Sequence, residues 1–259
     1  MPNYAANISM LFTEYPFVER IDRAAAAGFR AIECQFPYAE DVDRIAQSLA
    51  NHGMTLALFN LPAGDFAAGE RGIANNPAKR PQFRDGVARG LDLAQRFGCA
   101  KINCLVGMRL PDVAEAEQWA TVEENLAFAA EAAETVGVLQ VVEPLNGKDN
   151  PGFLLPRQDE AFDLVRRIGH PNLKVQYDLV HAQRMEGYLI ATIREHFAEI
   201  GHIQLADSPD RHEPGTGEIN FPNVLAAIDA LGYAGWVGLE YRPSRHTEES
   251  FGWMADLQP

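Results

Sequence analysis

The sequence predicts an α/β fold in which eight parallel strands close into a (β/α)8 barrel, the TIM barrel, with residues 1–259 as a single domain. Short apolar runs alternate with helix-like stretches eight times, and no change of composition divides the chain. Its 259 residues are close to the roughly 250 that such a barrel needs. An open doubly wound sheet is the alternative, but no glycine-rich turn follows the first apolar run.

Four strand–helix units are expected in the first half of the chain. The expected strands are 4–8, 30–36, 55–60 and 101–106, and their helices are 16–27, 40–52, 81–97 and 113–136. Pro16 opens the first helix and Gly28 closes it, because proline suits the first helical turn and glycine the residue after the last. The polar loop 61–80 is either a surface excursion or a lid. Its expected hinges are Gly64, Gly69 and Gly72.

The second half repeats the pattern with four more units. The expected strands are 138–142, 173–177, 202–206 and 236–240, and their helices are 158–168, 183–198, 222–231 and 247–256. Irregular segments cover 144–156 and 207–220. The long segments therefore follow the third, fifth and seventh strands, on the side of the barrel where catalytic loops lie.

Each of the last four strands ends on, or close to, an oxygen-bearing side chain: Glu143, Asp178, Gln204 and Glu240. A closed barrel brings the carboxyl ends of its strands to one rim, so these side chains are expected to converge. Three carboxylates repel one another unless a cation lies between them. An all-oxygen set suits Mg2+ or Mn2+, whereas zinc prefers His or Cys. The alternative is that each acid pairs with an Arg or Lys of a neighbouring loop.

Five further residues are candidates for contact with a substrate. His181 follows Asp178 by three residues, so it can donate to a substrate oxygen, bind the metal, or cap a helix. Arg211 and Lys148 can grip an anionic group, although both also fit a solvated loop. Asn7 and Glu33 close the first two strands and are expected to line the same rim.

Composition limits the partners of the protein. Its 22 Lys and Arg against 36 Asp and Glu give a formal charge of −14, which disfavours nucleic acid and anionic membranes. No apolar run approaches the roughly 18 residues of a membrane span, and the first residues do not resemble a signal peptide. Three scattered cysteines suit a reducing compartment, so a cytoplasmic protein is expected. The sequence leaves open whether the protein forms a homo-oligomer.

Long motifs along the whole chain resemble the hydroxypyruvate isomerase family, within the xylose-isomerase-like group of TIM barrels. They are AANISMLFTEYPFVERI, FNLPAGDFAAGERGIA, VVEPLN, QYDLVHAQ, HIQLADSPDRHEPGTGEINF and GLEYRPSRHTEESFGW. The motif positions that match the four metal ligands of related ketose epimerases are Glu143, Asp178, Gln204 and Glu240. Many relatives have His at the third of these positions, and Gln204 is similar to the isomerase branch.

The resemblance implies an activity and residue roles. The activity is interconversion of hydroxypyruvate and tartronate semialdehyde, with Glu143 and Glu240 as the acid/base pair. His181 and Arg211 would contact the substrate, a small hydroxy-keto acid whose carboxylate Arg211 or Lys148 would hold. The 2-oxotetronate isomerases share nearly all these motifs and remain an alternative. A DNA-repair endonuclease and a non-catalytic sugar- or acid-binding barrel are more distant ones.

Overall fold

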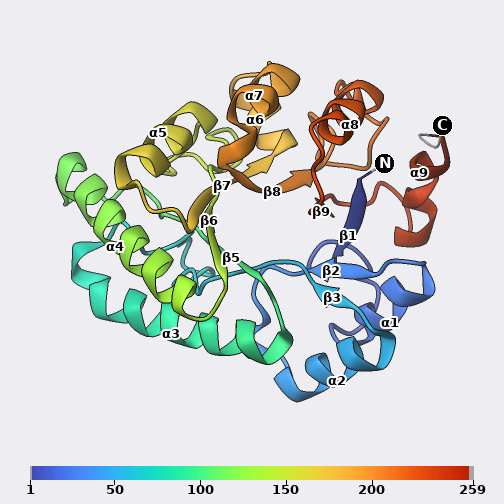
Figure 1. The fold of residues 1–259 in the computed structure, drawn as a ribbon, viewed down its shortest axis with the longest axis horizontal. Coiled ribbons are helices and arrows are strands. Elements are labelled where there is room, and N and C mark those ends of the chain that lie inside the picture. The colour runs from blue at the N-terminus through green and yellow to red at the C-terminus, as the bar shows by residue number, and fades with distance from the viewer. Residues whose placement is uncertain (1, 257–259) are drawn as a thin grey trace.

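Nine parallel strands form one sheet in the computed structural model of the chain, which describes residues 2–256 (Figure 1). The strands are β1 (Asn3–Asn7), β2 (Ala31–Glu33), β3 (Thr55–Leu56), β4 (Phe59–Asn60), β5 (Lys101–Cys104), β6 (Leu139–Val142), β7 (Leu173–Asp178), β8 (Ile200–Leu205) and β9 (Trp236–Leu239). Their order in the sheet is β3-β2-β1-β9-β8-β7-β6-β5-β4. Each strand is short and mostly buried, as expected for a sheet covered on both faces.

The segment 55–60 closes the barrel. The sequence predicts one strand here, but the structure has two, because the two halves of the segment pair with different strands. β3 pairs with β2 and β4 pairs with β5, so the two ends of the sheet order belong to one segment. Between them, the Ala57 amide still donates to the Ile32 carbonyl at 2.7 Å. The (β/α)8 barrel is thus confirmed, and the open sheet is excluded.

Helices surround the strands in an outer ring (Figure 1). They are α1 (Glu19–Ala26), α2 (Val42–His52), α3 (Arg80–Phe97), α4 (Glu115–Thr135), α5 (Gln158–Ile168), α6 (Leu179–Met185), α7 (Leu189–His196), α8 (Phe221–Ala230) and α9 (Trp253–Asp256), with 3-10 turns at Pro37–Ala39, Pro77–Lys79, Phe197–Glu199 and Thr247–Phe251. Over residues 2–256, none of these helices is long and apolar enough to cross a membrane.

Three of the expected helices differ from those observed. The first begins at Glu19, so Pro16 lies before it and does not open it. The single helix expected over 183–198 is two helices, α6 and α7, because Gly187 and Tyr188 both have left-handed backbone angles that interrupt it. α6 also begins earlier than expected, directly after β7, where the Asp178 carboxylate caps it by accepting from the Val180 amide at 2.8 Å. The last expected helix, 247–256, is mostly a 3-10 turn followed by the short α9.

A buried carboxylate lies inside the barrel, beneath the rim. Glu33 is fully buried and accepts from Asn7 Nδ2 at 3.0 Å, Gln204 Nε2 at 2.7 Å and His202 Nε2 at 2.8 Å. Gly238 on β9 makes room for it, since a Cβ there would overlap the Glu33 carboxylate. Burial raises the pKa of Glu33 to about 7, although two amides oppose the shift.

This pKa predicts how stability depends on pH. A carboxyl whose pKa is higher in the folded than in the unfolded protein keeps its proton on folding. Its contribution to the free energy of unfolding therefore falls as the pH rises from its usual value near 4.5 to about 7. The slope contributed by Glu33 is at most about 1.4 kcal/mol per pH unit.

We expect Glu33→Gln to remove this slope. Gln is isosteric and neutral, and His202, whose Nδ1 has no partner within the described part of the chain, can move its proton to that atom. Urea unfolding of the metal-free proteins between about pH 5 and about pH 7 measures the difference. Glu131 is exposed on α4, so Glu131→Gln is the control for the loss of one carboxylate. Parallel pH profiles for wild type and Glu33→Gln would contradict the prediction.

Candidate active site

A cavity of about 900 Å³ opens at the carboxyl ends of the strands. Four of the predicted site residues line it: Glu143, His181, Arg211 and Glu240. Asp178 lies next to His181 and Arg211, and Gln204 is its register partner on the neighbouring strand β8. The barrel therefore brings the strand-end residues together on one side, where its loops form the cavity walls.

Glu143 directly follows β6 and is buried. Its Oε2 accepts from Asn103 Nδ2 at 2.9 Å, whereas its Oε1 is buried and has no hydrogen-bond partner within residues 2–256. Burial, and then the charges of Glu240 and Asp178, raise the pKa of Glu143 well above its usual value. An unpartnered carboxylate oxygen in this position is costly unless another group binds it.

Arg211 joins two of the other acids. Its Nη2 donates to Asp178 Oδ2 at 3.2 Å and to Glu240 Oε2 at 2.6 Å. Its backbone is left-handed, with φ of 59°, and the loop 207–220 holds it there. The Asp207 carboxylate stabilises that loop by accepting from the four amides of Ser208, Gly215, Gly217 and Ile219. Three carboxylates thus face one guanidinium, so negative charge is in excess.

Glu240 is held from several sides. Arg211 donates to its Oε2, and its Oε1 accepts from Gln35 Nε2 at 3.0 Å and from Asn7 Nδ2 at 3.2 Å. Burial raises the pKa of Glu240 to about 7, although Arg211 favours its charged form. In the metal-free protein, Glu240 is consequently an oriented carboxyl group that exchanges a proton near neutral pH.

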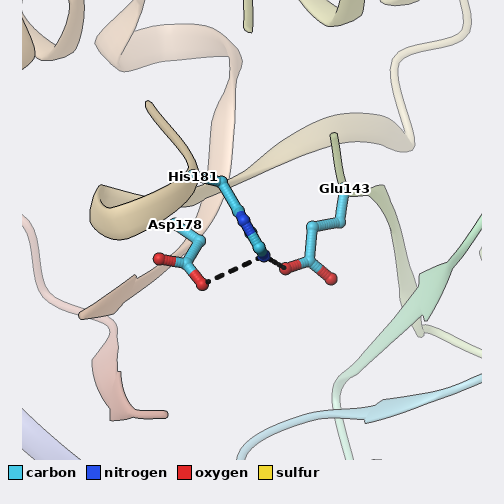
Figure 2. Close-up of side chains that lie close together, drawn as sticks. All are labelled: Glu143, Asp178 and His181. Atoms are coloured by element: carbon cyan, nitrogen blue, oxygen red, sulfur yellow. Dashed lines mark ion pairs between the residues drawn. The ribbon is translucent and has the colours of Figure 1, made fainter. Parts of the chain in front are cut away.

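His181 lies between Glu143 and Asp178 (Figure 2). Its Nε2 is 3.8 Å from Glu143 Oε1 and 3.6 Å from Asp178 Oδ2. Burial lowers its pKa to about 4, so the ring is neutral near pH 7. The backbone N–H and the side-chain amide of Asn146 both point at Nδ1, at 3.3 and 2.6 Å, so Nδ1 accepts and the proton is on Nε2.

This tautomer makes His181 a donor at Nε2. A protonated ring nitrogen does not ligate a metal, so the arrangement favours contact with a substrate oxygen over metal binding. Arg211 Nη1 also lies 3.2 Å from the same nitrogen, which places two N–H groups face to face. An acceptor atom between them would remove this unfavourable contact.

The donor set fits a hard divalent cation. It offers the unpartnered Oε1 of Glu143, together with the Asp178 and Glu240 oxygens that share Arg211. Gln204 Oε1 accepts from Gln176 Nε2 at 2.6 Å, and a second lone pair of that oxygen is left for a metal contact. Buried oxygens with excess negative charge are what Mg2+ or Mn2+ binds best.

The structure places the other predicted residues away from the cavity wall. Lys148 is exposed and is not among the residues that line the cavity. Asn7 and Glu33 are buried beneath the rim, where they orient Glu240 and Gln204. The loop 61–80 does reach the cavity, through Phe66 and Arg71.

Several residues of the site had not been identified in the sequence. Asn60 closes β4, so the rule of polar strand ends would have found it. Asn103 lies inside β5, one residue before its end, and that rule does not indicate it. Gln35 lies just beyond β2 and follows the same rule. Arg71 and Arg184 line the cavity from loop 61–80 and helix α6, and no spacing in the sequence indicates them.

Comparisons with known proteins identify the family of the chain. Residues 21–257 match the family described as xylose isomerase-like TIM barrel. The chain is 46% identical over 254 residues to hydroxypyruvate isomerase of Escherichia coli and 44% identical over 254 residues to 2-oxo-tetronate isomerase of Cupriavidus necator. Each alignment covers 98% of this chain and 98% of the relative.

Solved structures show the same fold. One is a crystal structure described as AP endonuclease, family 2, from Brucella melitensis, which is 41% identical to this chain. The two superpose with a TM-score of 0.96 over 100% of both chains. D-psicose 3-epimerase from Clostridium cellulolyticum, at 21% identity, has a TM-score of 0.75 over 93% of this chain and 85% of that chain. This chain belongs to the xylose isomerase-like TIM barrel family.

Proposed function

We propose that this protein is an isomerase of short hydroxy-keto acids that interconverts hydroxypyruvate and tartronate semialdehyde. The observation that carries the proposal is the pair Glu143 and Glu240, which line one cavity from strands β6 and β9 and whose pKa values are both raised. Relatives that match along nearly the whole chain are named hydroxypyruvate isomerase and 2-oxo-tetronate isomerase.

The reaction moves one proton between neighbouring carbons. A carboxylate removes a proton from the hydroxymethyl carbon of hydroxypyruvate, and a proton returns to the former carbonyl carbon. In the same reaction the hydroxyl proton moves from the hydroxymethyl oxygen to the former carbonyl oxygen, so that the product is an aldehyde with a hydroxyl group on the neighbouring carbon. A base whose pKa lies near the working pH is well suited to this step. Glu143 and Glu240 are the proposed pair, with the order unassigned. His181 Nε2 and Arg211 are placed to donate to the substrate oxygens on which negative charge develops.

We further propose that Glu143, Asp178, Gln204 and Glu240 hold Mg2+ or Mn2+. When bound, the cation would supply positive charge next to the oxygens of the substrate and so make the transferred proton more acidic. An acid that also ligates a cation is a weaker base. The glutamate that transfers the proton is therefore expected to use only one oxygen for the cation.

The second candidate substrate is 2-oxotetronate, because the Cupriavidus necator relative is almost as similar as the Escherichia coli one. The two substrates differ by one CHOH unit. A panel that compares the kcat/KM values of both acids separates the two candidates.

Two other kinds of activity are further alternatives. The description of the Brucella melitensis structure raises a DNA-repair endonuclease, which the charge of −14 opposes because such a protein needs a basic face for DNA phosphates. A non-catalytic acid-binding protein would keep the cavity but need no acid/base pair. Hydroxypyruvate incubated in deuterated water separates them, since only an isomerase exchanges the transferred proton with solvent.

A cytoplasmic location also belongs to the proposal. The three cysteines Cys34, Cys99 and Cys104 are all free and buried in the structure, as expected for a reducing compartment. The sequence leaves self-association open, and sedimentation of the protein would determine it.

Removal of the metal is expected to abolish activity. Dialysis against a chelator should stop isomerisation of hydroxypyruvate, and added Mg2+ or Mn2+ should restore it, because the acidic cluster binds oxygen-seeking cations. Coupled turnover assays and metal analysis of the same samples measure the effect. Full turnover by protein shown to be free of metal would exclude the metal from the reaction.

Replacing a proposed acid/base group, with metal in excess so that the proposed cation site stays filled, tests the role of Glu240 in the reaction. Glu240→Gln should lower kcat by roughly a hundredfold or more, the scale of a lost general base, while the fold persists because Gln can still accept from Gln35 and Asn7. Glu131→Gln on the surface of α4 is the matched control. Near wild-type turnover, with an unchanged melting temperature, would remove Glu240 from the mechanism.

A further inference from the structure

The floor of the cavity is unsuited to an anion. Glu143, Asp178 and Glu240 bring three carboxylates together, and Arg211 is shared between two of them. With the proposed cation bound, the charges of the three carboxylates, Arg211 and the cation cancel, so the floor offers the carboxylate of a keto acid no net attraction. A carboxylate therefore needs a cation elsewhere on the cavity wall that is free to bind it.

Four arginines line the cavity: Arg71, Arg184, Arg211 and Arg242. Arg211 donates to the acids of the floor and faces the reacting oxygens of the substrate, and Arg184 donates to the Asp149 carboxylate and the Pro209 carbonyl. Arg242 is exposed, so solvent screens its charge. Arg71 is half-buried and has no carboxylate partner within residues 2–256, which leaves its charge available to a ligand.

The guanidinium of Arg71 is held in place before any ligand arrives. It lies over the Phe66 ring, 3.6 Å from the centroid, and Phe66 in turn contacts Phe36, with 5.4 Å between the ring centroids. Its Nη1 donates to the carbonyls of Phe66 at 3.1 Å and Glu70 at 2.8 Å. The opposite edge, formed by Nε and Nη2, is the edge that binds a carboxylate with two parallel hydrogen bonds.

The backbone next to Arg71 is fastened to the barrel. Gly72 forms an antiparallel bridge with Val106, just beyond β5, and its amide donates to the Ala63 carbonyl at 3.0 Å. Gly72 has φ of 102°, and a Cβ there would overlap the Leu105 carbonyl oxygen. Close approach to β5, rather than hinge motion, therefore explains this glycine.

We propose that Arg71 is the carboxylate anchor of the substrate. It binds the acid end at the wall formed by loop 61–80, so that the hydroxyl and carbonyl carbons extend toward Glu143, His181 and Glu240. Arg71 would thereby set the preference for acids over neutral sugars of the same length. The inference rests on the proposed function for its substrate, but its binding test does not require turnover.

The test compares two ligands that the enzyme cannot isomerise, glycerate and its neutral amide, glyceramide. Calorimetry on the protein with Mg2+ or Mn2+ added should show wild type binding glycerate more tightly. In Arg71→Met this preference should fall roughly 10- to 100-fold, the scale of a charge-assisted pair, and Arg71→Lys should recover part of it. Arg242→Met, an exposed arginine of the same cavity, should keep the preference.

Turnover adds an independent measurement. Arg71→Met should raise the KM for hydroxypyruvate by a similar factor and lower kcat less, because Arg71 contacts the end of the substrate that does not react. If Arg71→Met is folded and keeps the preference for glycerate, or if Arg242→Met loses it instead, the inference is overturned. If wild type prefers glycerate through Arg71 but does not isomerise hydroxypyruvate, the proposed function fails and the anchor stands.

Discussion

The repulsion among Glu143, Asp178 and Glu240 is the constraint on which the rest of the site depends. Side chains of this kind occur at the rim of a barrel only where something balances their charge. Arg211 balances part of it by bridging Asp178 and Glu240, at the cost of a left-handed backbone. One oxygen of Glu143 has no hydrogen-bond partner in the part of the chain that the structure describes. The site is therefore held in a state that favours the arrival of positive charge.

Closure of the barrel sets the distances within this cluster. The segment 55–60 pairs with β2 through its first half and with β5 through its second, so no strand edge stays open. Closure also places Glu33 of β2 against Gly238 of β9 and beside Gln204 of β8. The polar interior thus continues from the buried Glu33 up to the rim, and the amides of Asn7 and Gln204 connect the two levels.

The sequence predicts the barrel and the converging strand ends because both follow from periodic patterns. Strand–helix alternation implies parallel strands, and a polar residue after a buried strand indicates the rim, which locates Glu143, Asp178 and Glu240. Finer features depend on contacts that no local pattern encodes. Tyr188 interrupts an otherwise regular helical pattern, and the side chain of Lys148 faces solvent even though its loop follows a strand of the site. The position of the Arg71 guanidinium depends on its contact with the Phe66 ring and on the bridge between Gly72 and Val106, and neither contact follows from the sequence.

Arg211 and the proposed cation would compete for the same oxygens. Asp178 Oδ2 and Glu240 Oε2 both accept from one Arg211 nitrogen, and those atoms are among the donors expected for the cation. A cation that binds them weakens both bonds to Arg211, because an oxygen shared between two positive centres interacts less strongly with each. The guanidinium would then be released toward the cavity, next to the Nε2 proton of His181. On this argument, binding of the metal prepares two donors for the reacting oxygens of the substrate, while Arg71 holds the carboxylate at the opposite end.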